Sequence, residues 1–450
     1  MLSKKRLFEP VIGSNLEKVK EDVTKGIPIF LTGEAGSGKT YLINRLYEEL
    51  SKDKKYTVYK TASTGIAAYG IEGTTINSFA GYGTLSSLDM AEHTDRCKNT
   101  VRAIAANPDT AKRINSCTHL IIEEVSMIDN QVLDFLNRLF KYVRKKPKIF
   151  MGGITVILSG DLLQLPPVSC SMHKDDRIKS TIHAKCWNNF RVHYLTTSYR
   201  QTDENFLALL NRLRRGTISD EDKKLLQSRV KPKMSSNIKA LELFGSNRQV
   251  DQRNTEKLES IDGPEYNYFA EDWCSNKSID IKKIRSTNDK HTMYKLYLKI
   301  KVGARVMLLK NLDVSMGLVN GALGTVIGCS KNYVTVKFDS TELVRNIIRD
   351  IQSFEYLGAT YSRQQLPLTL AYACTIHKSQ GLTLDKCVLN LSKANIYTND
   401  YGKVYVALSR CRSLEGLFIR NIAFNVICAD QEIVDWYDSL LKESKDDCEE

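Results

Sequence analysis

Residues 33–40, Gly-Glu-Ala-Gly-Ser-Gly-Lys-Thr, have the types and spacing of a loop that binds a phosphate chain. Its glycines let backbone N–H groups curl around a β-phosphate, while Lys39 can reach the β- and γ-phosphates and Thr40 can hold Mg²⁺. An apolar run precedes the loop at residues 27–32 and a helical pattern follows it, which is the context that this chemistry requires. The alternative, a glycine-rich turn without a ligand, does not explain that context. We therefore predict a nucleoside-triphosphate site that uses Mg²⁺.

Two carboxylates follow a second apolar run, residues 119–122, and could complete this site. A phosphate loop needs acidic partners from a neighbouring strand, so we expect Glu123 to support Mg²⁺ and Glu124 to polarise the attacking water. The alternative is that both acids only favour the start of the next helix. Asp161 and Gln164 follow a third run and are suited to sensing the γ-phosphate, although a glutamine in a proline-bounded loop is otherwise a turn residue.

These side chains need a scaffold, and in the first 200 residues short apolar runs alternate with helical patterns. Such alternation predicts a parallel sheet covered by helices on both faces. Residues 69–115 are richer in Gly, Ser, Thr and Asn, and we expect them to form an insertion on that sheet. The predicted strands are residues 27–32, 57–62, 119–122 and 154–159.

A comparable pattern after residue 195 predicts a second sheet of the same type. Within it, residues 296–366 contain β-branched runs separated by Asn-Gly and other Gly-containing turns, which predicts a small all-β barrel inserted in the second sheet. The strands expected in the second sheet are residues 240–244, 368–373, 387–391 and 417–420, and those expected in the barrel are residues 304–309, 324–328 and 333–338.

The size and composition of the chain are those of a folded, water-soluble protein. Its 450 residues suggest two to four domains of about 150 residues each, and 42% hydrophobic residues leave enough apolar material for real cores. The 65 Lys and Arg residues exceed the 52 Asp and Glu residues, giving a net charge of +13. That excess favours a polyanionic partner, with nucleic acid ahead of an anionic membrane surface.

Cysteine usage and hydropathy bear on the cellular compartment. Eleven cysteines are scattered without a Cys-x-x-Cys pair, so we expect free thiols, no disulfide bridges and no zinc. No apolar run reaches the roughly 18 residues that span a bilayer. The N-terminal segment lacks the apolar core of a signal peptide. We therefore expect an intracellular protein without a membrane partner.

Further motifs follow one another in the order of a known family. They are residues 61–68 (Thr-Ala-Ser-Thr-Gly-Ile-Ala-Ala), 73–81 (Gly-Thr-Thr-Ile-Asn-Ser-Phe-Ala-Gly), 159–168 (Ser-Gly-Asp-Leu-Leu-Gln-Leu-Pro-Pro-Val), 198–201 (Ser-Tyr-Arg-Gln), 318–324 (Leu-Val-Asn-Gly-Ala-Leu-Gly), 375–383 (Thr-Ile-His-Lys-Ser-Gln-Gly-Leu-Thr) and 405–411 (Tyr-Val-Ala-Leu-Ser-Arg-Cys). With the phosphate loop and the Glu-Glu-Val-Ser-Met segment, they resemble the Pif1 branch of superfamily 1 DNA helicases. Residues 127–153 resemble the signature that separates Pif1 proteins from their RecD and Dda relatives.

The resemblance implies an α/β fold with two RecA-like P-loop NTPase domains and an inserted SH3-like β-barrel. The implied boundaries are residues 1–195 for the first domain, with its insertion at about 69–115, residues 196–295 and 367–450 for the second, and residues 296–366 for the barrel. It also implies an ATP- and Mg²⁺-dependent helicase that moves 5′ to 3′ on single-stranded DNA and unwinds duplex DNA. Family roles include DNA replication, recombination, repair and the resolution of G-quadruplexes, and the sequence does not choose among them.

The resemblance also assigns roles to individual residues. Arg200 and Arg410 would deliver positive charge to the γ-phosphate as arginine fingers, and Lys39, Glu124 and Gln164 would complete the catalytic set. The implied nucleotide-binding residues are Gly33, Glu34, Ala35, Gly36, Ser37, Gly38, Lys39, Thr40 and Gly381, and the implied Mg²⁺ ligands are Thr40 and Glu123.

Two grips on the phosphates of single-stranded DNA are implied, one in each sheet. The first consists of Ser63, Thr64 and Gly65, and the second of Thr375, His377 and Lys378. Asn77 and Phe79 would add base contacts, although Phe79 could equally belong to the core and His377 could be a satisfied core histidine. The expected partners are single-stranded and tailed duplex DNA, bound by a monomer in the nucleus or wherever the genome is replicated.

Four positions depart from the family pattern. Glu123 replaces an Asp, which lengthens the Mg²⁺-side carboxylate by one methylene but keeps its charge. Asn77 stands where the family usually has His, and Lys403 where it has Gln. Leu16, beside Asn15, occupies the place of an adenine-reading Gln, so dATP or other nucleotides could serve as well as ATP. Two alternatives stay open: a catalytically weakened single-stranded DNA-binding protein of the same fold, and an RNA-dependent ATPase.

Overall fold

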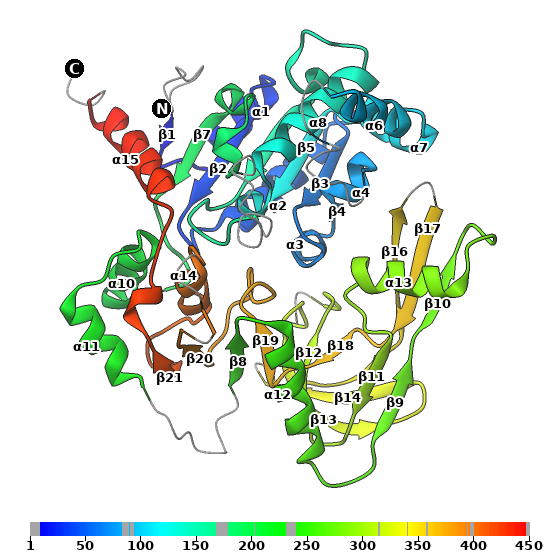
Figure 1. The fold of residues 1–450 in the computed structure, drawn as a ribbon, viewed down its shortest axis with the longest axis vertical. Helices are drawn as coiled ribbons and strands as arrows, with labels where there is room; N and C mark the ends of the chain where they lie inside the picture. The colour runs from blue at the N-terminus through cyan, green and yellow to red at the C-terminus, as the bar shows by residue number, and fades with distance from the viewer. Residues whose placement is uncertain are drawn as a thin grey trace. The chain divides into compact units, whose positions relative to one another are not determined.

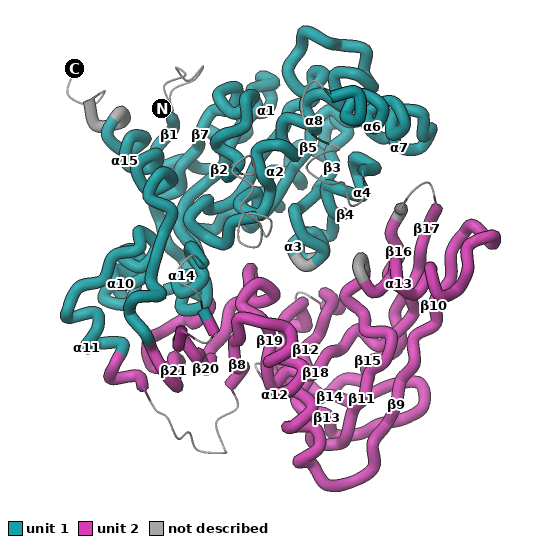
Figure 2. Tube along the Cα trace, viewed as in Figure 1, with its two compact units in different colours: residues 1–226, 396–409, 423–450 teal, residues 227–395, 410–422 magenta. Residues whose placement is uncertain are grey.

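A computed structural model of the chain describes residues 10–82, 90, 94–167, 179–201, 203–230, 240–313, 316–339, 341–356, 359–393, 395–396 and 400–446 (Figure 1). The chain divides into two compact units. Unit 1 comprises residues 1–226, 396–409 and 423–450, and unit 2 comprises residues 227–395 and 410–422 (Figure 2).

Unit 1 is built on a seven-stranded parallel sheet in the order β1-β7-β2-β6-β5-β3-β4. Its strands are β1 (Val11–Ile12), β2 (Ile29–Gly33), β3 (Val58–Ala62), β4 (Thr74–Thr75), β5 (His119–Glu123), β6 (Thr155–Ser159) and β7 (Arg191–Leu195). Every residue of β2, β5 and β6 is buried, as expected for strands that are covered on both faces. The predicted parallel sheet is confirmed.

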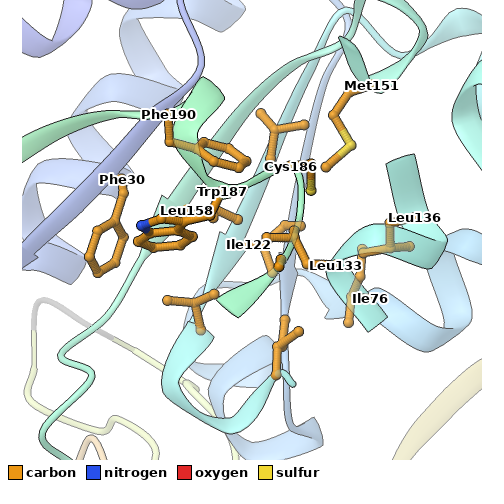
Figure 3. Close-up of a cluster of buried hydrophobic side chains, with 14 of the residues drawn as sticks. Phe30, Ile76, Ile122, Leu133, Leu136, Met151, Leu158, Cys186, Trp187 and Phe190 are labelled. Atoms are coloured by element: carbon orange, nitrogen blue, oxygen red, sulfur yellow. The ribbon is translucent and has the colours of Figure 1, made fainter. Parts of the chain in front are cut away.

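Helices cover both faces of this sheet (Figure 1). Successive side chains of a strand point to opposite faces, so Ile29 and Leu31 join one core while Phe30 joins another. The core around Phe30 also contains Leu133 and Trp187 (Figure 3). The helices of unit 1 include α1 (Leu16–Thr24), α2 (Lys39–Ser51), α3 (Gly65–Gly70), α4 (Ile76–Ala80), α6 (Asp95–Ala105), α7 (Pro108–Ser116), α8 (Asn130–Val143), α10 (Glu204–Arg214), α14 (Lys403–Leu408) and α15 (Gln431–Asp446). Helix α11 (Asp220–Ser228) crosses the boundary between the two units.

Unit 2 contains the predicted second parallel sheet, in the order β19-β8-β20-β21. Its strands are β8 (Leu241–Phe244), β19 (Ala373–Thr375), β20 (Cys387–Leu391) and β21 (Leu417–Ile422), and the helices α12 (Asn247–Glu259) and α13 (Ile281–His291) belong to the same unit. Two sheets of parallel strands with flanking helices are the core expected of two RecA-like domains.

The single strand predicted at residues 368–373 is wrong, because the chain changes sheets within it. Leu368–Leu370 forms β18 and pairs with the antiparallel strand β12, whereas β19 begins at Ala373 and pairs with β8. Between them, the side-chain oxygen of Asn254 accepts the N–H groups of Tyr372 and Ala373, at 3.1 and 2.9 Å. A side chain remote in sequence therefore redirects the strand.

Antiparallel strands of unit 2 begin about thirty residues before the predicted barrel, at Tyr266. They form a five-stranded sheet β15-β14-β13-β12-β18, a three-stranded sheet β10-β17-β16 and the pair β11-β9. Their bounds are β9 (Tyr266–Phe269), β10 (Glu271–Cys274), β11 (Tyr297–Ile300), β12 (Arg305–Leu308), β13 (Leu323–Cys329), β14 (Tyr333–Phe338), β15 (Val344–Ile348), β16 (Asp350–Tyr356) and β17 (Ala359–Gln365). Over the described residues, β15 and β18 are the edges of the five-stranded sheet, and no ladder closes it into a barrel.

Two observations concern the predicted compartment. Within the described ranges, no helix is both long enough and apolar enough to cross a bilayer. The nine cysteines that these ranges contain all carry free thiols, and six of them are buried.

Candidate functional site

The phosphate loop joins β2 to α2 in unit 1, as the motif predicts. Its backbone needs glycine at Gly36 and Gly38, whose φ angles are +84° and +83°. A Cβ atom on Gly36 would lie 2.6 Å from the Cβ of Arg200. The loop is thus fixed against the segment that carries the first predicted arginine finger.

The Lys39 ammonium lies over this loop. Its Nζ donates to the carbonyl oxygens of Gly33 and Glu34, both at 2.8 Å. Burial lowers the pKa of Lys39, while the charges of Asp161 and Glu124 act in the opposite direction. A triphosphate would offer this ammonium charged oxygen acceptors in place of those carbonyls.

Thr40 and Glu123 come together as predicted. The Thr40 hydroxyl donates to the Glu123 carboxylate, which is 5% exposed. Burial, together with the charge of Glu124, raises the pKa of Glu123 to about 7. A hydroxyl beside a buried, poorly compensated carboxylate is a donor set that suits Mg²⁺, because the cation would restore the missing positive charge.

Glu124 has an unusual backbone conformation. Its φ and ψ angles are +54° and +47°, in the left-handed region, and it begins the 3₁₀ turn η1 (Val125–Met127). Its charge influences both Lys39 and Glu123, so its carboxylate lies within electrostatic reach of the loop and the Mg²⁺ ligands. Sequence reasoning placed Glu124 in the site but gave no sign of this strained backbone.

Asp161 does not have the predicted role. Its carboxylate is fully buried and bound to the guanidinium of Arg214, with contacts of 2.7 and 3.0 Å. Burial raises the pKa of Asp161, but the charge and hydrogen bonds of Arg214, together with the Lys39 charge and the Leu163 N–H, outweigh burial, so the net shift is downward. The prediction that Asp161 senses a γ-phosphate is therefore corrected, because both of its carboxylate oxygens already accept hydrogen bonds from Arg214.

Gln164 is buried beside this pair. It lines a small cavity together with Ser126, Ser180 and Tyr401. The N-terminus of α14 packs closely here, because a Cβ on Gly402 would lie 2.4 Å from the Gln164 carbonyl oxygen. Lys403, the position where the family pattern has Gln, is also buried, and its ammonium pairs with Asp400 at 2.7 Å.

The two predicted arginine fingers belong to different units. Arg200 is in unit 1, where its Nη1 donates to the Ser409 carbonyl oxygen at 3.1 Å and its charge lowers the pKa of Lys39. Arg410 is in unit 2, where its side chain is 2% exposed. Gly381 is also in unit 2, with a φ of +84°. The roles of Arg410 and Gly381 toward the nucleotide stay predictions.

The two predicted phosphate grips share a local construction. Ser63 and Thr64 follow β3, and the Thr64 hydroxyl oxygen accepts the Ala67 N–H at 3.2 Å at the start of α3. Thr375 ends β19, and its hydroxyl oxygen accepts the Lys378 N–H at 3.2 Å. In each segment a hydroxyl residue at a strand end caps the turn that follows. His377 is half-buried and Lys378 exposed, which leaves both ring and ammonium at the surface of unit 2.

The chain is similar in sequence and fold to known proteins. The family model "PIF1-like helicase" matches residues 4–224, and "DNA helicase Pif1, 2B domain" matches residues 289–329. The "ATP-dependent DNA helicase PIF1" of Xenopus laevis is 37% identical over 94% of this chain and 64% of its own length. The crystal structure of Pif1 helicase from Candida albicans has a TM-score of 0.77 and 31% identity, covering 95% of this chain and 99% of that one.

The chain belongs to the Pif1 helicase family. A Bacteroides Pif1 helicase, crystallised in complex with ADP-AlF3 and single-stranded DNA, is also similar, with a TM-score of 0.67 and 29% identity over 95% of this chain and 97% of that one. This chain spans slightly less than two thirds of the length of the Xenopus relative.

Phe79, predicted to contact bases, lies instead in the core of this Pif1 family member. Its side chain is 1% exposed, and its ring centroid lies 5.1 Å from that of Tyr59 and 6.2 Å from that of Phe140. The structure favours the core alternative. Asn77 is half-buried, and its side-chain oxygen accepts the Tyr82 hydroxyl at 2.9 Å.

Sequence reasoning missed several residues that shape the site. Arg214 on α10 neutralises Asp161, and the Tyr437 ring on α15 lies 4.5 Å from the Arg214 guanidinium. The Tyr405 hydroxyl accepts the Ala35 N–H of the phosphate loop at 2.8 Å. Tyr405 sits inside the recognised 405–411 motif, so its position could have been suspected, whereas nothing local marks Arg214 or Tyr437.

Proposed function

We propose that this Pif1 family member is an ATP-dependent DNA helicase that moves 5′ to 3′ on single-stranded DNA and unwinds duplex DNA. The observation that carries the proposal is the assembly of Lys39, Thr40, Glu123 and Glu124 around one phosphate loop. The complex of the Bacteroides relative with ADP-AlF3 and single-stranded DNA supports both ATP and a DNA strand as ligands.

The chain's own residues would divide the work of hydrolysis. Lys39 binds the β- and γ-phosphates, Thr40 and Glu123 hold Mg²⁺, and Glu124 accepts a hydrogen bond from the attacking water and orients it. Mg²⁺ supplies charge that offsets the negative charge of the phosphates. Arg200 adds positive charge from beside Gly36. The role of second arginine finger is proposed for Arg410.

The same proposal covers the architecture and the partners. The boundaries 1–195, 196–295 with 367–450, and 296–366 would define the two RecA-like domains and an SH3-like domain, the last supported by the match of a 2B-domain model to residues 289–329. Single-stranded and tailed duplex DNA would be bound by a monomer at the two phosphate grips. An intracellular site where the genome is replicated is the location that fits this activity.

Strand-specific unwinding tests the proposal. Purified protein is given two labelled duplexes, one with a 5′ single-stranded tail and one with a 3′ tail, in the presence of ATP and Mg²⁺. The expected result is opening of the 5′-tailed duplex alone, with none in the Lys39→Ala variant. Opening of the 3′-tailed duplex alone would reverse the polarity. DNA binding without unwinding would favour the weakened DNA-binding protein, and equal stimulation of hydrolysis by RNA and DNA would favour an RNA-dependent ATPase.

A further inference from the structure

Ser63 connects the first phosphate grip to the residues that would act on ATP. Strands β3 and β5 pair in parallel with Ala62 opposite Glu123, which brings the next residue, Ser63, alongside Glu124. The Ser63 N–H donates to the Glu123 carbonyl oxygen at 3.0 Å, and the Ser63 hydroxyl donates to the Glu124 carbonyl oxygen at 2.7 Å. One residue therefore binds the backbone of both carboxylates.

The backbone that Ser63 holds is strained. A residue with a Cβ pays roughly 1 to 3 kcal/mol for the left-handed conformation, and such a conformation persists only where its surroundings fix it. At Glu124 two hydroxyl groups do so, because the Thr181 hydroxyl lies 2.5 Å from the Ile128 carbonyl oxygen, its nearer acceptor, and 3.1 Å from the Val125 carbonyl oxygen, both in the turn that follows Glu124. Thr181 is fully buried, whereas Ser63 is half-buried. Of the two restraints, Ser63 is the one that a ligand at the surface can reach.

The hydroxyl of Ser63 has one proton to donate. With DNA bound, two acceptors would compete for that proton: the Glu124 carbonyl oxygen and a DNA phosphate. In this structure the proton goes to the Glu124 carbonyl oxygen. A DNA phosphate at the grip carries negative charge and is a stronger acceptor than a neutral carbonyl. Binding of a strand would therefore draw the proton away from Glu124, whose carboxylate influences Lys39 and Glu123.

We propose that Ser63 is the positioning residue through which a bound DNA strand resets the backbone of Glu124 and so stimulates ATP hydrolysis. The inference rests on the proposed function, and it assigns to one hydroxyl group the link between strand and active site. Removal of that hydroxyl separates strand binding from hydrolysis. The ratio of the DNA-saturated to the DNA-free hydrolysis rate is then expected to fall about tenfold, the change that corresponds to one hydrogen bond.

The test is steady-state ATP hydrolysis titrated with oligo(dT) for the wild type and for Ser63→Thr and Ser63→Val. The two variants have side chains of the same shape and differ only in the hydroxyl, so any packing fault affects both alike. We expect Ser63→Thr to keep most of the stimulation ratio and Ser63→Val to lose about tenfold of it at saturating DNA. Thr64→Ala is the matched comparison, because its hydroxyl caps α3 and has no bond to Glu124 among the described contacts.

Other roles for Ser63 predict different results in the DNA titration. A Ser63 that only held a phosphate would behave as we expect of Thr64→Ala, raising the DNA concentration needed for half-maximal stimulation. If Ser63→Val kept the wild-type ratio at saturating DNA, the inference would be overturned and the proposed function left standing. A wild-type protein whose hydrolysis did not respond to DNA would overturn both.

Discussion

Asp161 and Arg214 form an ion pair closed off from solvent, with the guanidinium donating to both carboxylate oxygens. Their exposed fractions are 0% and 3%. Three elements meet at this pair: the loop after β6, helix α10, and helix α15 through the Tyr437 ring. The pair thus fixes α15 to the loop that follows β6, an interior strand of the sheet that carries the phosphate loop.

Loss of Arg214 is expected to destabilise unit 1 strongly. Arg214→Ala leaves the Asp161 carboxylate buried without a counter-charge, and such losses cost about 3 to 5 kcal/mol. The neighbouring Arg215→Ala is the control, because Arg215 pairs with Asp438 at exposed fractions of 35% and 41%, where a pair contributes about 0 to 1 kcal/mol. Urea unfolding followed by circular dichroism measures both. Equal losses in the two variants would contradict the structural role of the buried pair.

The fold could be predicted from the sequence only where the apolar pattern of a segment matches its burial in the structure. Strands β2, β5 and β6 are wholly buried apolar runs and were all predicted. Strand β7 was missed because Arg191 and His193 interrupt its apolar residues; both bind Asp22 on α1, a partner that is distant in sequence. The antiparallel strands before residue 296 are short and half-exposed, which gives them little periodic signal.

In the candidate site, too, contiguous motifs could be predicted from the sequence, whereas contacts between distant segments could not. The phosphate loop is contiguous, so its chemistry follows from eight consecutive residues. The bonds from Ser63 to Glu123 and Glu124 depend on the register of two strands that lie sixty residues apart in the chain. The burial of Asp161 and Phe79 depends on partners in other helices and strands. The sequence suggested that each of these two side chains contacts a ligand, and only the packing of the folded chain shows that both are buried.

Stability should fall as pH rises towards neutrality, because the pKa of Glu123 is raised from its ordinary value of 4.5 to about 7. Between those values the folded protein binds more protons than the unfolded chain, so the free energy of unfolding decreases with pH. Glu123→Gln removes this slope, and Mg²⁺ with ADP should reverse it, because metal binding requires the ionised carboxylate. Urea unfolding at about pH 5 and about pH 8 measures the difference. A slope that Glu123→Gln leaves intact would point to another group.

Substitution of Gly36 should disable the nucleotide site. Gly36→Ala places a Cβ 2.6 Å from that of Arg200 at a φ of +84°, so the loop or Arg200 must move. We expect affinity for a fluorescent ATP analogue to fall about five- to thirty-fold, the change that corresponds to about 1 to 2 kcal/mol of left-handed strain. Gly70→Ala is the control, because a Cβ there meets nothing within 4 Å. Unchanged affinity in Gly36→Ala would show that the loop adjusts without loss.

Phe79 should contribute to stability and not to DNA affinity. Phe79→Ala removes a ring that packs against Tyr59 and Phe140, and large-to-small changes at such sites cost about 3 to 5 kcal/mol. Urea unfolding gives the stability, and fluorescence anisotropy with labelled oligo(dT) gives the affinity. Phe79→Leu is the matched variant, with a smaller loss expected. A variant of normal stability with weakened DNA binding would restore the base-contact role.

Nucleotide preference should be broad, because Leu16 has no amide group and the Asn15 side-chain oxygen already serves as the cap of α1. Leu16 packs against the core of α1 and α2, and the Asn15 side-chain oxygen accepts the Lys18 N–H at 3.0 Å as the helix cap. We expect kcat/KM for ATP and GTP to differ by less than about tenfold, the size of one neutral hydrogen bond. Leu16→Gln should raise the preference for ATP, and Leu16→Met, of similar volume but without the amide, should not. A wild type that already selects ATP strongly would mean that another part of the chain reads the base, and in that case Leu16→Gln would add little.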